Sequence, residues 1–126
     1  MDVRFYALWA ALAWAGWGDG AKLRSWRTTS SFVAGTPPSE RYLAGAAVLD
    51  DARLVIFDGC GAAGRLGDLL QLDIPTLLWT SLSVAAVGTQ PPAMCGPGMV
   101  QHNGSLLIFG GVAASGYSVD TYRFDL

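Results

Sequence analysis

The chain has 126 residues and a formal net charge of −2, from 8 Lys and Arg residues against 10 Asp and Glu residues. This length fits one small domain, and the lack of a basic excess removes the electrostatic basis for nucleic-acid binding. Hydrophobic residues make up 52% of the chain and charged residues only 14%, with 16 Gly and 6 Pro, which excludes a disordered polar chain and indicates a compact, turn-rich fold.

Residues 1–22 contain an uncharged apolar run over residues 5–18. The run is too short to cross a membrane as a helix, but it fits the apolar region of a secretory signal peptide. Ala13 and Ala15 offer the small residues that a signal peptidase reads. The alternative is a degraded repeat, because residues 2–8 loosely echo later segments. We therefore expect a secreted or extracellular protein if Phe5 to Ala15 is part of a signal peptide, and a cytoplasmic protein otherwise.

Residues 39–82 contain four short apolar stretches that are rich in strand-forming residues and too short for helices. These stretches are 44–49, 54–57, 69–72 and the region around Trp79. Turn-forming residues separate them, namely Asp50-Asp51 and the pair Asp73 and Pro75. We expect four antiparallel strands.

Residues 91–126 show the same order of elements, with apolar stretches at 98–102, 106–109 and 121–124. Asn103-Gly104 lies between the first two, and this dipeptide is typical of a two-residue hairpin because both residues accept positive φ. The sequence predicts three strands here, and residues 23–29, which carry Trp26, have the character of a fourth that would close this unit.

The two units form an internal repeat. Residues 54–74 align without a gap on residues 106–126, and a period near 50 residues is typical of propellers and solenoids. The shared positions include Phe57 and Phe109, Gly59 and Gly111, and Asp68 and Asp120.

This pattern resembles the Kelch repeat of the galactose oxidase-like central domain superfamily. The residues that carry the resemblance are an apolar strand ending in glycine, a spaced Asp and a Trp on the last strand: Phe57, Gly59, Asp68, Trp79, Phe109, Gly110, Gly111 and Asp120. In the first unit Asp58 replaces a glycine, and in the second Cys95 or a neighbour stands where an Arg is expected. The resemblance implies an all-β fold, a Kelch-type β-propeller segment of about two four-stranded antiparallel blades, with Trp79, Phe57 and Phe109 packed between blades.

A propeller needs four to eight blades, so two blades require further blades or self-association. The chain is expected to be a fragment of a longer product, one of several copies that form a ring, or a truncated product without function.

The sequence offers little for catalysis, with 1 His and 2 Cys. His102 is expected to be an exposed turn residue, and no metal-ligand spacing accompanies it. Relatives such as galactose oxidase use several His and Tyr ligands for copper, which a single His cannot supply. We therefore predict no enzymatic activity, no cofactor and no metal site.

In the implied blade, the loops after the second strand and before the first strand emerge on the same rim. That placement brings Cys60 and Cys95 to one rim, where they would form a disulfide in an exported protein. The same rim is expected to display Arg41, Asp58, Arg65 and Tyr117.

These features predict a non-catalytic module that binds a protein partner of unknown identity through its loops, without nucleic acid and without a stable membrane span. The alternative is a fragment of a larger secreted enzyme, oxidase-like or carbohydrate-active, whose catalytic residues lie outside this chain.

Overall fold

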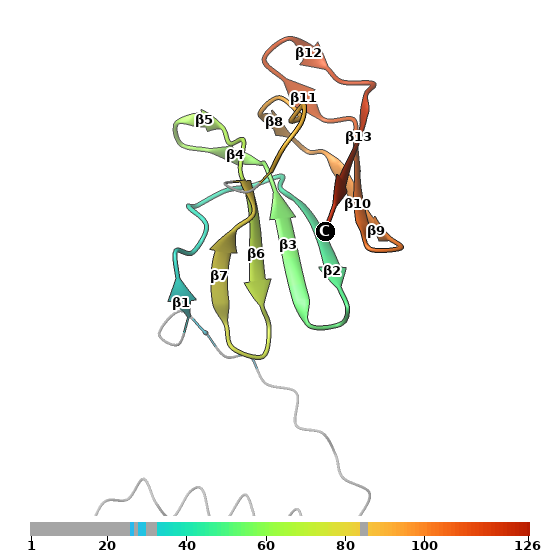
Figure 1. Ribbon diagram of the computed structural model, residues 1–126. Helices are drawn as coiled ribbons and strands as arrows, with labels where there is room; N and C mark the ends of the chain where they lie inside the picture. Colours follow the sequence, from blue (N-terminus) through green and yellow to red (C-terminus); the bar gives the residue numbers. More distant parts are fainter. Residues whose placement is uncertain (1–25, 27, 30–32, 84–85) are drawn as a thin grey trace, which may run out of the picture.

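The computed structural model describes residues 26, 28–29, 33–83 and 86–126. The signal peptide or degraded repeat expected over 1–22 lies outside these residues. In the described part the chain is built of short β-strands joined by turns, which confirms the all-β, Kelch-type expectation (Figure 1). Among the same residues no helix is long and apolar enough to cross a membrane.

The first repeat forms one sheet, which we call blade 1, with the strand order β1-β7-β6-β3-β2. Its strands are β1 (Ala34–Gly35), β2 (Gly45–Leu49), β3 (Arg53–Phe57), β6 (Leu69–Asp73) and β7 (Leu78–Ser81). Strands β2, β3, β6 and β7 pair in antiparallel fashion and correspond to the four predicted strands. Strand β1 was not predicted, and it pairs in parallel with β7.

The second repeat forms a smaller sheet, blade 2, with the order β13-β10-β9. Its strands are β9 (Gly98–His102), β10 (Ser105–Phe109) and β13 (Thr121–Asp125). Among the described residues β13 pairs only with β10. Trp26 is exposed and outside any strand, and much of segment 23–29 is outside the described residues, so closure of blade 2 by that segment stays a prediction.

The tight turns follow from their residues. Asp50 and Asp51 have φ of 51° and 54°, and Asn103 and Gly104 have φ of 47° and 77°. Asp, Asn and Gly accept this left-handed region better than other residues. Two positive φ values in succession match the right-handed twist of the flanking strands. Asn103-Gly104 therefore closes the β9–β10 hairpin as a two-residue turn, whereas three residues, Asp50, Asp51 and Ala52, separate the paired Leu49 and Arg53 in the β2–β3 hairpin.

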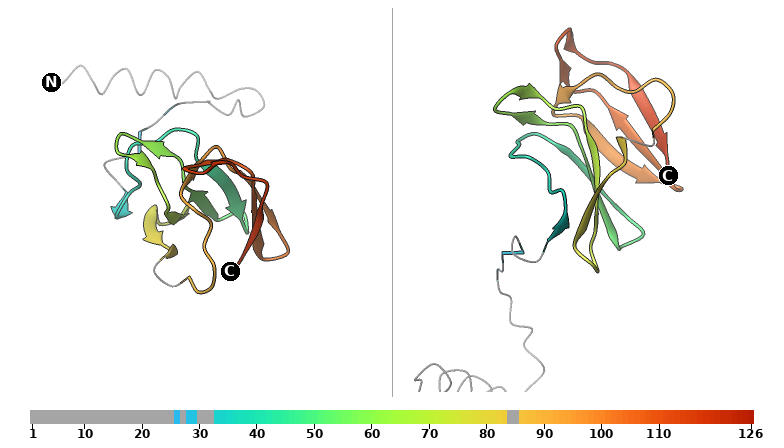
Figure 2. Two further views of the ribbon diagram at one scale, coloured as in Figure 1. Left: turned by 90° about the horizontal axis from the view of Figure 1, so that it is seen from above. Right: turned by 60° about the vertical axis from the view of Figure 1, so that its left-hand side comes forward.

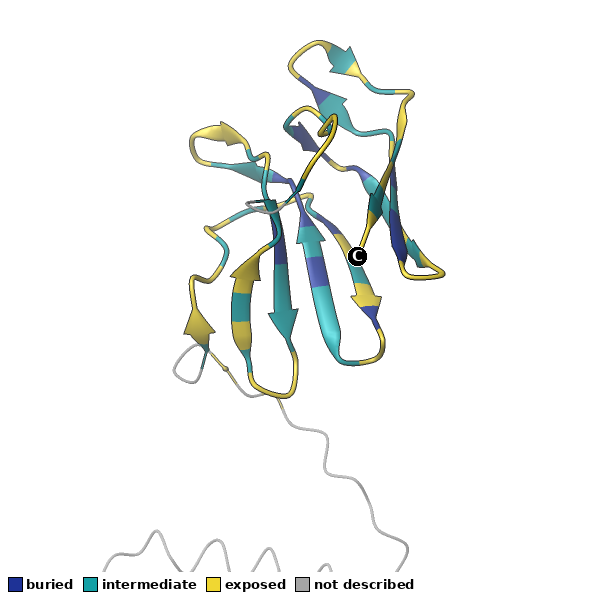
Figure 3. Ribbon diagram, in the orientation of Figure 1, coloured by how far each residue is buried: buried dark blue, intermediate teal, exposed yellow. Residues whose placement is uncertain are grey.

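The two blades share one hydrophobic core (Figure 3). Side chains alternate between the two faces of each strand, so every second side chain faces the other blade. The buried residues of the core are Leu49, Val55, Phe57, Leu69, Met94, Leu106, Ile108 and Ala113. Full burial of one large aliphatic side chain is worth roughly 1.5–3 kcal/mol, so this core accounts for the association of the two sheets (Figure 2).

Two of the aromatic residues expected between blades lie on the outer faces of the two described blades. Phe109 lies on the outer side of blade 2 and is 56% exposed, with its ring over Gly98. Trp79 pairs with Leu72, whose side of blade 1 faces away from blade 2. Packing of both residues against a further blade stays a prediction, because the partner of each outer face is not among the described residues.

Candidate binding rim

Five two-residue strands gather at one end of the blades, and we call this end the loop rim (Figure 1). It consists of β4 (Cys60–Gly61), β5 (Gly64–Arg65), β8 (Met94–Cys95), β11 (Val112–Ala113) and β12 (Gly116–Tyr117), together with residues 40–43. Hairpin β4–β5 comes from the first repeat and hairpin β11–β12 from the second. The rim is therefore a composite of both repeats.

Hydrogen bonds join the two repeats directly beneath the rim. The Arg65 side chain donates from Nε to the carbonyl oxygen of Val112 at 2.8 Å. The backbone amide of Gly59 donates to Met94 at 3.1 Å, and that of Gly96 donates to Leu43 at 2.8 Å. These bonds fix the two hairpins relative to each other.

Cys60 and Cys95 lie together in this region and are joined as a disulfide, with Cα atoms 5.4 Å apart across 35 residues of sequence. This separation is within the ordinary range for a disulfide. The bond would tie hairpin β4–β5 to the segment that enters blade 2. Its formation in the cell stays a prediction.

Arg65 and Tyr117 are both exposed on the rim, as expected, and 89% of Tyr117 is accessible. Sequence reasoning missed Tyr42 and Leu43, which are also exposed beside them. The signal for these two residues is their position directly after Arg41 and before the first strand, where the chain turns with a φ of 53° at Leu43. The accessible rim therefore combines an arginine, two tyrosines and a leucine.

Arg41 does not reach the rim surface, because its side chain is only 7% exposed. Its guanidinium donates to both carboxylate oxygens of Asp68, at 2.7 Å and 2.9 Å, and to the carbonyl oxygen of Asp58 at 3.1 Å. Such a bidentate pair is among the stronger charge-assisted contacts. The expectation that Arg41 is displayed was wrong, and its contacts instead hold the loop after β3 to the start of β6.

Asp58 is fully buried, so the expectation that it is displayed was also wrong. It takes the place of Gly110 and adopts the same left-handed conformation, with φ of 58° against 66°. This turn directs its carboxyl inward, where neither oxygen accepts a hydrogen bond from the described residues. Burial raises the pKa of Asp58 to about 7, with a further rise from Asp68 and a partial offset from the Met94 backbone and Arg41.

The second repeat lacks the arginine network. The repeat aligns Cys60 with Val112. Tyr42 forms a bridge with Cys60, and Cys95 pairs with Val112, so Cys95 occupies the position of Tyr42. Met94, the residue before Cys95, therefore takes the place of Arg41. Met94 is fully buried in the shared core. The neighbour of Cys95 thus replaces the expected arginine, and it stabilises the contact between the blades through apolar packing.

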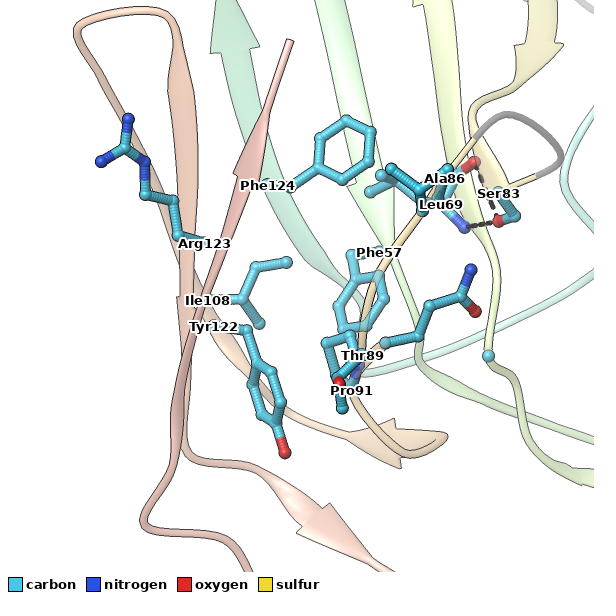
Figure 4. Close-up of a pocket in the computed structure, with 13 residues that line it drawn as sticks. Phe57, Leu69, Ser83, Ala86, Thr89, Pro91, Ile108, Tyr122, Arg123 and Phe124 are labelled. Carbon is cyan, nitrogen blue, oxygen red and sulfur yellow. Dashed lines mark hydrogen bonds between the residues drawn. The ribbon is translucent and has the colours of Figure 1, made fainter.

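A separate cavity of about 70 Å³ is lined by residues of both blades. Figure 4 shows Phe57 and Leu69 on one side and Ile108, Tyr122 and Phe124 on the other. Ser83 Oγ accepts a hydrogen bond from the Leu69 amide at 2.7 Å and caps the edge of this space. A cavity of this size holds a few waters at most.

The comparisons with known proteins agree with this architecture. The family model described as the KLHDC2/KLHL20/DRC7 Kelch-repeats domain matches residues 21–126. No curated protein matches the chain. Because the family model covers most of the sequence and both repeats fold as its pattern implies, the chain belongs to the Kelch-repeat family.

Proposed function

We propose that this chain is a non-catalytic module that binds a protein partner through the loop rim. The observation that supports the proposal most directly is the composite nature of the rim, in which two hairpins from different repeats are joined by the Arg65 to Val112 hydrogen bond. Kelch-repeat domains are in general protein-interaction modules, so the family membership supports a protein as the partner.

The chemistry of the exposed rim fits this role. Tyrosine and arginine are enriched at protein interfaces because they combine a large contact area with hydrogen-bonding groups. Tyr117, Tyr42 and Leu43 offer apolar area and Arg65 offers a guanidinium. The backbone that carries them is fixed in advance, which lowers the entropy that binding must overcome.

Other functions have less support. The net charge of −2 gives no footing for phosphate contacts. The alternative, part of a larger secreted enzyme, stays a prediction that no feature of the described residues favours.

A photo-crosslinking amino acid at Tyr117 tests the proposal in extracts of the source cells. We expect a protein partner to be captured from Tyr117 on the rim. The matched control places the same amino acid at His102, an exposed residue at the opposite end of β9, where we expect no capture.

Unlabelled chain added in excess must compete for the crosslink, and the variant Arg65→Ala must weaken this competition. Equal capture from both positions, or competition that Arg65→Ala leaves unchanged, would contradict binding through the rim.

A further inference from the structure

The contact between the two blades joins two different faces. Blade 1 contributes Val55 and Phe57, and blade 2 contributes Leu106 and Ile108. Because the two contacting faces differ, each blade has a second face that corresponds to the contact face of the other blade. These two corresponding faces remain uncovered at the two ends of the pair of blades.

The repeat identifies the free halves. Leu54 and Ile56 of β3 correspond to Leu106 and Ile108 of β10, and strand alternation points them away from blade 2. We call this outer side of blade 1 the leading face: Val48, Leu54, Ile56, Leu70, Leu72 and Trp79.

The outer side of blade 2 supplies the other half, and we call it the trailing face: Val100, Leu107 and Phe109. Phe109 corresponds to Phe57 and Leu107 to Val55. Val100 and Phe109 are 51% and 56% exposed. Exposed apolar residues gathered on one sheet face mark an interaction surface more often than isolated ones do.

The leading face also carries an unfilled groove of about 470 Å³, lined by Pro37, Leu70 and Trp79. It has the same construction as the small cavity between the blades, where Pro91 takes the place of Pro37 and Tyr122 that of Leu70. The difference is one wall: Phe57 of the facing blade lines the inner cavity, whereas every residue that lines the outer groove belongs to blade 1 or to the segment before it. The residue of the second repeat that corresponds to Phe57 is Phe109, on the trailing face.

We infer that the trailing face of one copy of this chain packs against the leading face of a second copy, with Phe109 seated beside Leu70 and Trp79. The contact between the two blades inside the chain is the model for this interface. Both of its faces have a counterpart on the outer sides of the blades, with apolar residues at the equivalent positions. Such head-to-tail contacts produce a ring when the rotation closes and a longer chain of copies when it does not.

The test is the mass of the full chain in solution by light scattering, over a concentration series. We expect the mass of the wild type to rise with concentration above the 13.3 kDa of one chain. Val48→Glu on the leading face and Val100→Glu on the trailing face are each expected to weaken association by about tenfold or more. Val119→Glu changes an exposed valine outside both faces and is expected to behave like the wild type.

Mixing the two variants gives the decisive result. The Val100→Glu copy keeps an intact leading face and the Val48→Glu copy keeps an intact trailing face, so the mixture must form a species of twice the single-chain mass. Circular dichroism checks that each variant is folded, and Val48→Thr with Phe109→Thr replaces them if a charge unfolds the chain, because Thr retains strand propensity.

A wild type that keeps the single-chain mass at every concentration would overturn the inference and assign both faces to repeats of a longer chain. A mixture of the two variants that keeps the single-chain mass would also overturn the inference. In that case the wild type would associate through two identical faces and not through one leading and one trailing face.

Discussion

Asp58 shows how one residue of the repeat changes the energetics of its loop. Its counterpart Gly110 has no side chain, whereas Asp58 carries a fully buried carboxyl without a hydrogen-bond partner among the described residues. Folding raises the pKa of Asp58 from 3.8 to about 7. The folded protein therefore retains a proton that the unfolded chain has already lost between these two pH values.

This difference in proton binding determines the direction in which the stability of the protein changes with pH. The stability contributed by Asp58 is present below about pH 4 and falls as pH rises through the folded pKa of about 7. Asp58→Asn removes the titration and tolerates the positive φ, so it should stabilise the protein by on the order of 2–4 kcal/mol at pH 8 relative to its effect at pH 4. Urea denaturation at both pH values measures the difference.

Asp51→Asn makes the same exchange at an exposed turn residue with positive φ and serves as the control. A change in stability for Asp58→Asn that is equal at pH 4 and pH 8 would contradict the buried carboxyl.

Arg41 is the second residue whose role lies inside the rim. Arg41→Lys keeps the charge but loses the paired contacts to Asp68 and the bond to the Asp58 carbonyl. We expect a loss of about 1–3 kcal/mol in the free energy of unfolding. Arg53→Lys, in the exposed ion pair with Asp50, should cost less than about 1 kcal/mol. Equal losses in the free energy of unfolding from the two variants would show that the Arg41 hydrogen bonds add no stability beyond that of an exposed ion pair.

At the scale of elements, the rim depends on the connection between the loop after β3 and the strand β8. The disulfide of Cys60 and Cys95 closes a separation of 35 residues, and a cross-link of this span restricts the unfolded chain. We expect the double variant Cys60→Ser and Cys95→Ser to lose about 2–4 kcal/mol of stability, measured by urea denaturation without reductant.

Wild-type protein treated with reductant should match the double variant, which separates loss of the bond from loss of the thiols. Two free thiols in the mass spectrum of non-reduced protein, with equal stability for both proteins, would rule out the disulfide.

The sequence predicts the long strands well because each of them is apolar, short and repeated. Strands β9 and β10 begin and end within one residue of their predicted ranges, and the predicted turns hold them in register. The two-residue strands, such as β4 and β12, are too short to show any alternation. Strand β1 forms only because β7 lies beside it, a tertiary contact that local sequence does not encode.

The candidate site was predicted in part for a related reason. Blade topology places loops on a rim, and Arg65 and Tyr117 are indeed exposed there. Topology does not give the direction of each side chain, which for Asp58 depends on a positive φ and for Arg41 on a distant carboxylate at Asp68. Those two residues therefore face inward although their backbone lies at the rim.

At the scale of the whole molecule, the central claim is that the two repeats form one cooperative unit that holds a single composite rim. The shared core includes Val55 of β3 and Leu106 of β10, both with no accessible surface. Each of these strands is central in its sheet, with a paired strand on both sides. Neither sheet can separate from the other without exposing this core to water.

Native-state hydrogen exchange of the Val55 and Leu106 amides is the measurement that tests this claim most directly. We predict that both amides exchange only through global unfolding, with the same free energy and the same dependence on denaturant. Exchange of Leu106 at a clearly lower free energy than Val55 would show that blade 2 unfolds by itself, and it would contradict a rim built from both repeats.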